Sequence, residues 1–277
     1  MSRPVVSSGH AGRSELAEAF SAARARLGLV AVLLALAALA WWLTAVRMVG
    51  MDAGPGTDIG ALGWFLGVWV VMMAAMMFPS LAPTVALYAR MTRRRGPDRA
   101  LLFAGGYLLV WGGAGLGAYG LYRIGRDLFG GDLAWHAGGR WFAAGVLVLA
   151  ALYEVTPLKD VCLAKCRSPI GFLLGSWREG RLGALEMGSR HGGWCLGCCW
   201  ALMAALFALG VMSLTWMAFV AALIALEKVV PWGRAVTWGA AAVLLVLAFM
   251  VVVAPHGVPG LVVPGSHSAM HAMKAMH

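Results

Sequence analysis

The sequence LGWFLGVWVVMMAAMMFPSLAPTVALYA, residues 62–89, contains no aspartate, glutamate, lysine or arginine. A helix needs about 20 mostly apolar residues to cross the hydrocarbon core of a bilayer. This stretch is long enough, and membrane helices tolerate prolines such as its Pro79 and Pro83. We therefore predict a transmembrane helix here. Further apolar stretches lie on both sides of it, at residues 28–46, 101–121, 141–155, 195–226 and 235–255.

The composition of the whole chain agrees with a membrane protein. Of its 277 residues, 61% are hydrophobic and 12% are charged, against about 45–50% and about 25% in soluble domains. The mean hydropathy of +0.79 leaves too little polar surface to cover a water-soluble globule of this size. These values exclude a soluble enzyme, a disordered chain and a disulfide-stapled secreted module. We predict an all-α fold: a polytopic transmembrane helical bundle.

The number of spans depends on residues 195–226. This stretch is too long for one upright transmembrane helix and short for two. A turn at residues 210–213 would divide them and give about seven spans, and without it there are six. With seven spans, 17 of the 22 basic residues lie on one side of the membrane and five on the other; with six, the division is 16 to 6. The positive-inside rule places the richer side in the cytoplasm and favours seven spans only slightly.

The same count orients the two ends of the chain in a bacterial inner membrane. We predict a basic N-terminal arm (residues 1–27) on the cytoplasmic side and a transmembrane domain (28–255) with an inner loop at 156–193. Residues 256–277 form a flexible tail on the periplasmic side. The net charge of +10 lies in blocks between apolar runs. It therefore sets orientation in the bilayer and gives no reason to expect nucleic-acid binding.

Methionine is concentrated in the quoted stretch, at Met72, Met73, Met76 and Met77. A spacing of four stacks Met72 over Met76 and Met73 over Met77 on neighbouring helix faces. Thioethers are soft, uncharged ligands that suit Cu(I). Methionine is also an ordinary filler of apolar cores, and this pattern alone favours packing over metal binding.

All five cysteines fall within 38 residues, and an odd number placed in this way does not indicate a disulfide framework. Thiolates with an imidazole and a thioether suit Cu(I) or zinc, and we favour Cu(I). Single cysteines also pack as small hydrophobes, but packing alone is a weaker explanation for five cysteines in one region. Gly192 and Gly193 argue against a helix that runs into the second group of cysteines. The candidate ligands here are Cys162, Cys166, His191, Cys195, Cys198, Cys199 and Met203.

The end of the chain is biased toward histidine and methionine. Such tracts are typical of loose metal binding, and a periplasmic tail would meet copper where it arrives. The candidate ligands are His267, Met270, His271, Met273, Met276 and His277.

Four ionisable residues lie at the ends of apolar stretches. Glu227 and Lys228 are adjacent in sequence, and we interpret them as a simple interfacial ion pair. Glu154 and Lys159 lie near a predicted helix end, where pairing or extension toward the interface is expected. No catalytic role is predicted for them.

Four motifs occur in order along the chain: WVVMMAAMMFPS at 69–80, TPLKDVCLAKCRSP at 156–169, MGSRHGGWCLGCCWALM at 187–203 and EKVVPWG at 227–233. With these motifs the chain resembles the DUF2182 family over residues 64–239. The resemblance implies a polytopic, metal-binding membrane protein connected with copper as a chaperone, without a settled mechanism. The N-terminal arm and the tail lie outside it.

The function we predict is that of a copper-binding membrane protein that collects Cu(I) and hands it over or translocates it. Its partners would be the lipid bilayer and a copper-dependent protein of the membrane or periplasm, and the oligomeric state stays open. One alternative is a membrane thiol-disulfide oxidoreductase that uses Cys195 and Cys198. Another is a non-catalytic membrane subunit whose cysteines and methionines only pack.

Overall fold

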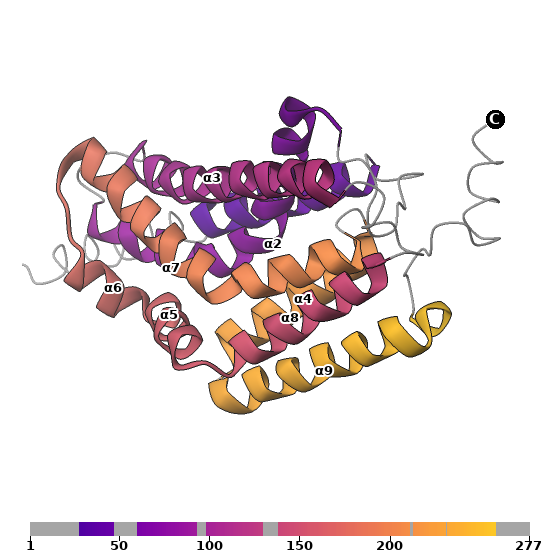
Figure 1. Ribbon diagram of the computed structural model, residues 1–277. Coiled ribbons are helices and arrows are strands. Elements are labelled where there is room, and N and C mark those ends of the chain that lie inside the picture. The colour runs from indigo at the N-terminus through magenta and orange to yellow at the C-terminus, as the bar shows by residue number, and fades with distance from the viewer. Residues whose placement is uncertain are drawn as a thin grey trace, which may run out of the picture.

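The computed structural model describes residues 28–46, 60–92, 98–129, 138–210, 213–230 and 232–258. All regular structure in these residues is helical, which confirms the all-α prediction (Figure 1). The N-terminal arm and residues 259–277, with all six candidate ligands of the tail, lie outside them. The helices are Gly28–Val46, α2 (Leu62–Met91), α3 (Asp98–Phe129), α4 (Arg140–Glu154), α5 (Pro157–Arg167), α6 (Pro169–Gly175), α7 (Gly180–Leu209), α8 (Leu214–Val229), α9 (Gly233–Val253) and the 3-10 helix Pro255–Gly257.

Five of the described helices are long and apolar enough to cross a membrane: Gly28–Val46, α2, α3, α7 and α9. α4 and α5 would add a sixth crossing if they form one span with a bend of 67°. α8 has 16 residues, which rise about 24 Å, less than the roughly 30 Å of a hydrocarbon core. The chain is a multi-pass helical membrane protein, and about seven spans result only when the short helices α4 and α8 count as separate crossings.

The bend between α4 and α5 is encoded locally. The hydroxyl of Thr156 accepts a hydrogen bond from the backbone N–H of Lys159 (3.3 Å) and donates one to the carbonyl of Tyr153 (2.7 Å). Pro157 occupies the first turn of α5, where a missing N–H costs nothing. The two helices therefore end and begin at a defined cap, which directs α5 back against the bundle.

Residues 156–193 differ from the predicted inner loop, because most of them are helical. α5 and α6 occupy the first part, and α7 starts at Gly180, well before Cys195. Gly192 and Gly193 lie inside α7 and do not end it.

Close packing between α3 and α7 explains part of this difference. A Cβ atom on Gly188 would overlap the backbone of Phe103, and one on Gly192 would lie 3.1 Å from the carbonyl oxygen of Tyr107. Small residues at such positions let membrane helices approach closely. These two glycines thus serve helix contact, and the packing gained outweighs their low helix propensity. Figure 1 shows α7 between α2 and α3 on one side and α4 and α9 on the other.

The turn predicted at residues 210–213 is confirmed. α7 ends at Leu209 and α8 begins at Leu214. Gly210 between them has φ of +115°, a backbone conformation that residues with a side chain rarely adopt. This reversal brings α8 back beside α7.

α2 continues as a helix through both of its prolines. Met72, Met73, Met76 and Met77 are all buried in the core of the bundle. Ser80, in the turn after Met77, donates a hydrogen bond to the Met77 carbonyl (2.9 Å). This section of α2 packs near the cysteines of α7.

Candidate metal centre

Three cysteines lie on one part of α7. Because helix positions three and four residues apart share a face, Cys195, Cys198 and Cys199 can gather there. All three are buried and carry free thiols. The sulfur of Cys198 lies 3.3 Å from the sulfur of Cys199 and 3.2 Å from the carbonyl oxygen of Cys195.

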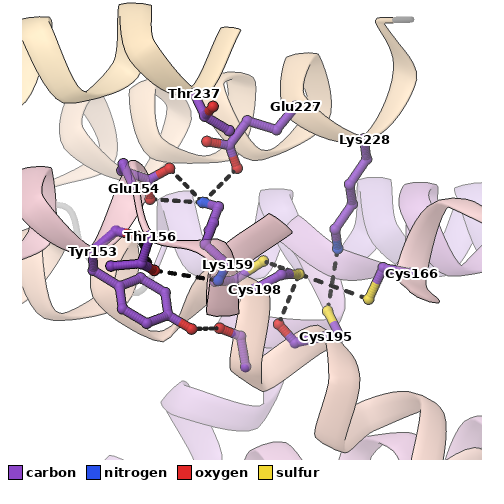
Figure 2. A network of polar contacts seen from close by, with 12 residues as sticks. Tyr153, Glu154, Thr156, Lys159, Cys166, Cys195, Cys198, Glu227, Lys228 and Thr237 are labelled. Atoms are coloured by element: carbon purple, nitrogen blue, oxygen red, sulfur yellow. Dashed lines mark hydrogen bonds and ion pairs between the residues drawn. The ribbon is translucent and has the colours of Figure 1, made fainter. Parts of the chain in front are cut away.

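α5 brings a further sulfur to this face from a distant part of the sequence. Cys166, in the last turn of α5, places its sulfur 3.7 Å from that of Cys198. The sulfurs of Cys166, Cys195 and Cys198 all lie within 4.8 Å of one another (Figure 2). We call these three residues the sulfur cluster. Their convergence is what a soft metal ion requires.

Two more helices touch Cys195 at the cluster. The sulfur of Met77 on α2 lies 4.0 Å from the Cys195 sulfur. From α3, the hydroxyl of Tyr107 lies 3.0 Å from the same sulfur. Cys195 is therefore held between a thioether and a phenol inside the bundle.

A cation also reaches the cluster. The ammonium of Lys228, on α8, lies 3.1 Å from the sulfur of Cys195 and 3.1 Å from the hydroxyl of Ser80, and its nitrogen is 3.9 Å from the sulfur of Met77. Figure 2 shows this side chain extending from α8 to Cys195. A fixed positive charge here favours negatively charged thiolates over neutral thiols.

The other predicted ligands take different positions around the cluster. The sulfur of Cys162 packs against Gly197, where a Cβ would lie 2.8 Å from it. His191 lies one turn before Cys195 among three aromatic rings, of which Phe172 is nearest at 4.9 Å between centroids. Its Nδ1 has no hydrogen-bond partner among the described residues. The remaining four, Met72, Met73, Met76 and Met203, are buried in the core.

The predicted ion pair between Glu227 and Lys228 is wrong. Glu227 binds the ammonium of Lys159 at 2.9 Å, and Lys228 turns instead to the sulfur cluster. Consecutive residues on a helix point about 100° apart, so they do not face each other. This rule could have separated the two side chains from the sequence alone. The pairing expected for Glu154 and Lys159 is confirmed, with oxygen–nitrogen distances of 2.5 and 2.6 Å.

Tyr107 and Ser80 were not predicted to belong to the site. Tyr107 lies in a stretch of α3 with no ligand-like pattern, and Ser80 stands at the end of the motif at 69–80 without a feature of a ligand. Neither has a local signal that distinguishes it, because contact with Cys195 or Lys228 depends on how α2, α3 and α7 pack.

A family model described as PpoB2, copper chaperone, matches residues 66–251. The chain belongs to the PpoB2 family. The match includes the sulfur cluster, Met77, Tyr107 and Lys228, and it supports the copper-chaperone resemblance under a different family name from the expected one. It excludes the N-terminal arm and the histidine- and methionine-rich tail. No curated protein and no solved structure matches the chain.

The donor set fits the metal that the PpoB2 family implies. Thiol sulfurs with a thioether nearby are soft ligands, and Cu(I) is among the metals that they suit. The carboxylates near the cluster point elsewhere, toward Lys159. The copper ion in such a protein is cargo, so a chaperone site must both hold it and release it.

Proposed function

We propose that this chain binds one Cu(I) ion at Cys166, Cys195 and Cys198 and hands it to a copper-dependent protein of the membrane or periplasm. The observation that carries this proposal is the convergence of three sulfurs from two helices, with Cys195 and Cys198 buried and Cys166 half-buried. Cysteine thiolates bind Cu(I) tightly, and burial protects the ion from water and from oxidation. The thioether of Met77 supports Cu(I) over zinc, because zinc sites use cysteine, histidine and carboxylate ligands.

Charge balance supports the same ion. One Cu(I) with two thiolates and the third cysteine as a neutral thiol carries a net charge of −1, and the ammonium of Lys228, 3.1 Å from the Cys195 sulfur, offsets it. A neutral assembly is the form that costs least inside a bundle. Lys228 is therefore the counter-ion of the loaded site.

The remaining predicted ligands form a route to and around the cluster. The tail collects copper on the periplasmic side, through His267, Met270, His271, Met273, Met276 and His277. Met73 lies one helical turn before Met77 on α2, so Met72, Met73 and Met76 offer transient thioether ligands. Cys162, His191, Cys199 and Met203 lie within two turns of the cluster on α5 or α7 and serve as auxiliary ligands during transfer. The orientation rests on the positive-inside rule, with the N-terminus in the cytoplasm of a bacterium.

Burial of the thiols counts against the oxidoreductase alternative. Thiol–disulfide exchange requires direct attack on a substrate sulfur, and its rate depends on access. Cys195 and Cys198 are each 1% exposed, so a protein disulfide cannot reach them without opening the bundle. An ion enters such a site more readily than a second protein does.

The test is Cu(I) affinity, measured by competition with a chromogenic chelator on the full chain in detergent. Cys195→Ser and Cys198→Ser are each expected to weaken binding at the tight site at least about 100-fold (about 2.7 kcal/mol). Cys162→Ser is the matched comparison for equilibrium binding, because Cys162 packs against Gly197 and in this proposal contacts copper only during transfer. We expect it to change the affinity less than about threefold.

Two results would overturn the proposal. One is unchanged tight binding in both Cys195→Ser and Cys198→Ser. The other is a preference for zinc over Cu(I) when both ions compete for the wild-type protein.

A further inference from the structure

A second buried site lies beside the sulfur cluster. Glu154 of α4, Lys159 of α5 and Glu227 of α8 form a cluster of charged groups that is 0–1% exposed (Figure 2). The ammonium of Lys159 contacts both oxygens of Glu154, at 2.5 and 2.6 Å, and one oxygen of Glu227 at 2.9 Å. We call these three residues the charge triad. Ionisable residues inside a membrane domain are costly and commonly mark ion or proton pathways.

The formal charges of the triad do not balance. Two carboxylates and one ammonium leave one net negative charge, and a buried charge without a partner is expensive. Among the residues that the structure describes, the groups that face the triad from the surrounding helices do not supply a second cation. From α9, Thr237 donates its hydroxyl to the carbonyl of Arg234, whose exposed guanidinium contacts Asp160.

The remaining neighbours are neutral hydrogen-bonding groups or point elsewhere. From α7 the triad is faced by the thiol of Cys199, and the hydroxyl of Tyr153 donates to the carbonyl of Gly197 at 2.5 Å. Lys228, next to Glu227 on α8, turns to Cys195. A proton is the simplest cation that can restore neutrality.

Two carboxyl oxygens mark where that proton would lie. Oε1 of Glu227 is buried and has no hydrogen-bond partner among the described residues, while Oε2 of Glu154 is buried with the ammonium of Lys159 at 2.5 Å as its contact. The two carboxyl groups are neighbours, because both contact the same ammonium nitrogen of Lys159. A proton shared between the two carboxyl groups would balance the charge and give Oε1 of Glu227 a hydrogen-bonding role.

We propose that the charge triad is a proton-binding site in which Glu154 and Glu227 share one proton, and that its occupancy is linked to copper in the sulfur cluster. The linkage rests on the proposed function. Its physical basis is that both sites use the same two helices: α5 carries Lys159 and Cys166, and α8 carries Glu227 and Lys228. A shift of either helix changes both sites.

The direction of the linkage follows from the charge at the cluster. When two thiols bind the ion, Cu⁺ + 2 RSH gives [Cu(SR)₂]⁻ + 2 H⁺, the protons go to solvent and copper stays Cu(I). With the ammonium of Lys228 included, the charge falls from +1 to 0. A less positive neighbour strengthens proton binding. Copper loading therefore tightens the hold of the triad on its proton.

Infrared spectroscopy of the full chain tests the proton directly, in a detergent without carbonyl groups. A protonated carboxylic acid has a C=O stretch that an ionised carboxylate lacks. We expect this band in the metal-free protein at neutral pH and its loss in both Glu154→Gln and Glu227→Gln. Each variant leaves one carboxylate paired with Lys159 and needs no proton, so each is expected to fold. Glu186→Gln is the control, because Glu186 is half-exposed and contacts Arg178 and Arg190; it should keep the band.

Each outcome decides a separate part of the proposal. Absence of the band at neutral pH, or its persistence in both variants, would overturn the shared proton. In wild-type protein shown to bind Cu(I) at the cluster, the band should persist to a higher pH after loading, and an unmoved band would overturn the linkage. If the cluster binds no copper, the proposed function fails, while the metal-free spectrum still tests the proton.

Discussion

Two lysines inside this bundle have opposite surroundings. The ammonium of Lys159 lies between two carboxylates at 2.5–2.9 Å, and that of Lys228 lies against a thiol, a hydroxyl and a thioether at 3.1–3.9 Å. Lys159 has more negative charge around it than it can balance. Lys228 has no formal anion among these contacts unless a thiol ionises.

The difference separates a lysine that is paired with or without metal from a lysine that gains its anionic partner when metal binds. Carboxylates are ionised or protonated whether or not metal is present, so the triad ties α4, α5 and α8 together at all times. The thiols at Lys228 become anions when they bind a soft cation, and the ammonium then gains its partner. Lysine thus stabilises the fold at position 159, and at position 228 it balances the charge of the metal-bound thiolates.

The largest effect on stability is expected when both glutamates of the triad are replaced. Glu154→Gln with Glu227→Gln leaves Lys159 as a lone buried cation, which costs about 3–5 kcal/mol. The Tm in detergent, followed by size-exclusion chromatography after heating, should fall by at least about 6 °C relative to wild type. Each single variant should stay within about 3 °C. A double variant as stable as the singles would show that the charge on Lys159 needs no partner.

Removal of the other ammonium should leave the fold intact and weaken the metal site. Lys228→Met keeps an unbranched apolar side chain and removes the counter-ion of the thiolates. We expect about a tenfold loss of Cu(I) affinity, about 1.4 kcal/mol, with little change in Tm. Lys165→Met is the matched control, since Lys165 is exposed on α5 beside Cys166. Equal losses in both variants would mean that overall charge, and not contact with Cys195, matters.

A further effect is expected where α3 meets α7, the contact that holds Tyr107 against Cys195. Gly188→Ala would push a methyl group into the backbone of Phe103, and overpacking of this kind costs about 1–3 kcal/mol. Gly193→Ala places its methyl group in open space and should be neutral or slightly stabilising. Thermal unfolding of the two variants in parallel measures the difference. Equal Tm values would contradict the close approach of these helices.

The membrane helices and the region that holds the ligands could be predicted from the sequence, because local sequence patterns identify both. Apolar stretches of about 20 residues identify spans, and five cysteines in one region identify where sulfur gathers. The course of α7 through Gly192 and Gly193 was not readable, since those glycines are compatible with helix only when α3 packs against them.

The choice of ligands within that region also depends on tertiary packing. Cys162 and Cys166 look alike in sequence, yet only the second brings its sulfur into the group of three with Cys195 and Cys198. The sequence predicted Lys228 as the partner of Glu227, but in the structure Glu227 pairs with Lys159 of α5. Which neighbours these side chains meet is set by how α5 packs against α7 and α8, and no local pattern encodes that packing.

The most direct test of the central claim is X-ray absorption at the copper edge on the full chain loaded with one equivalent of Cu(I). We predict a shell of sulfur neighbours only, which persists when the histidines and methionines of the tail are replaced by serine and is lost in Cys195→Ser with Cys198→Ser. A shell of nitrogen or oxygen neighbours in the wild-type protein, or a sulfur shell that survives loss of both cysteines, would contradict a copper site at Cys166, Cys195 and Cys198.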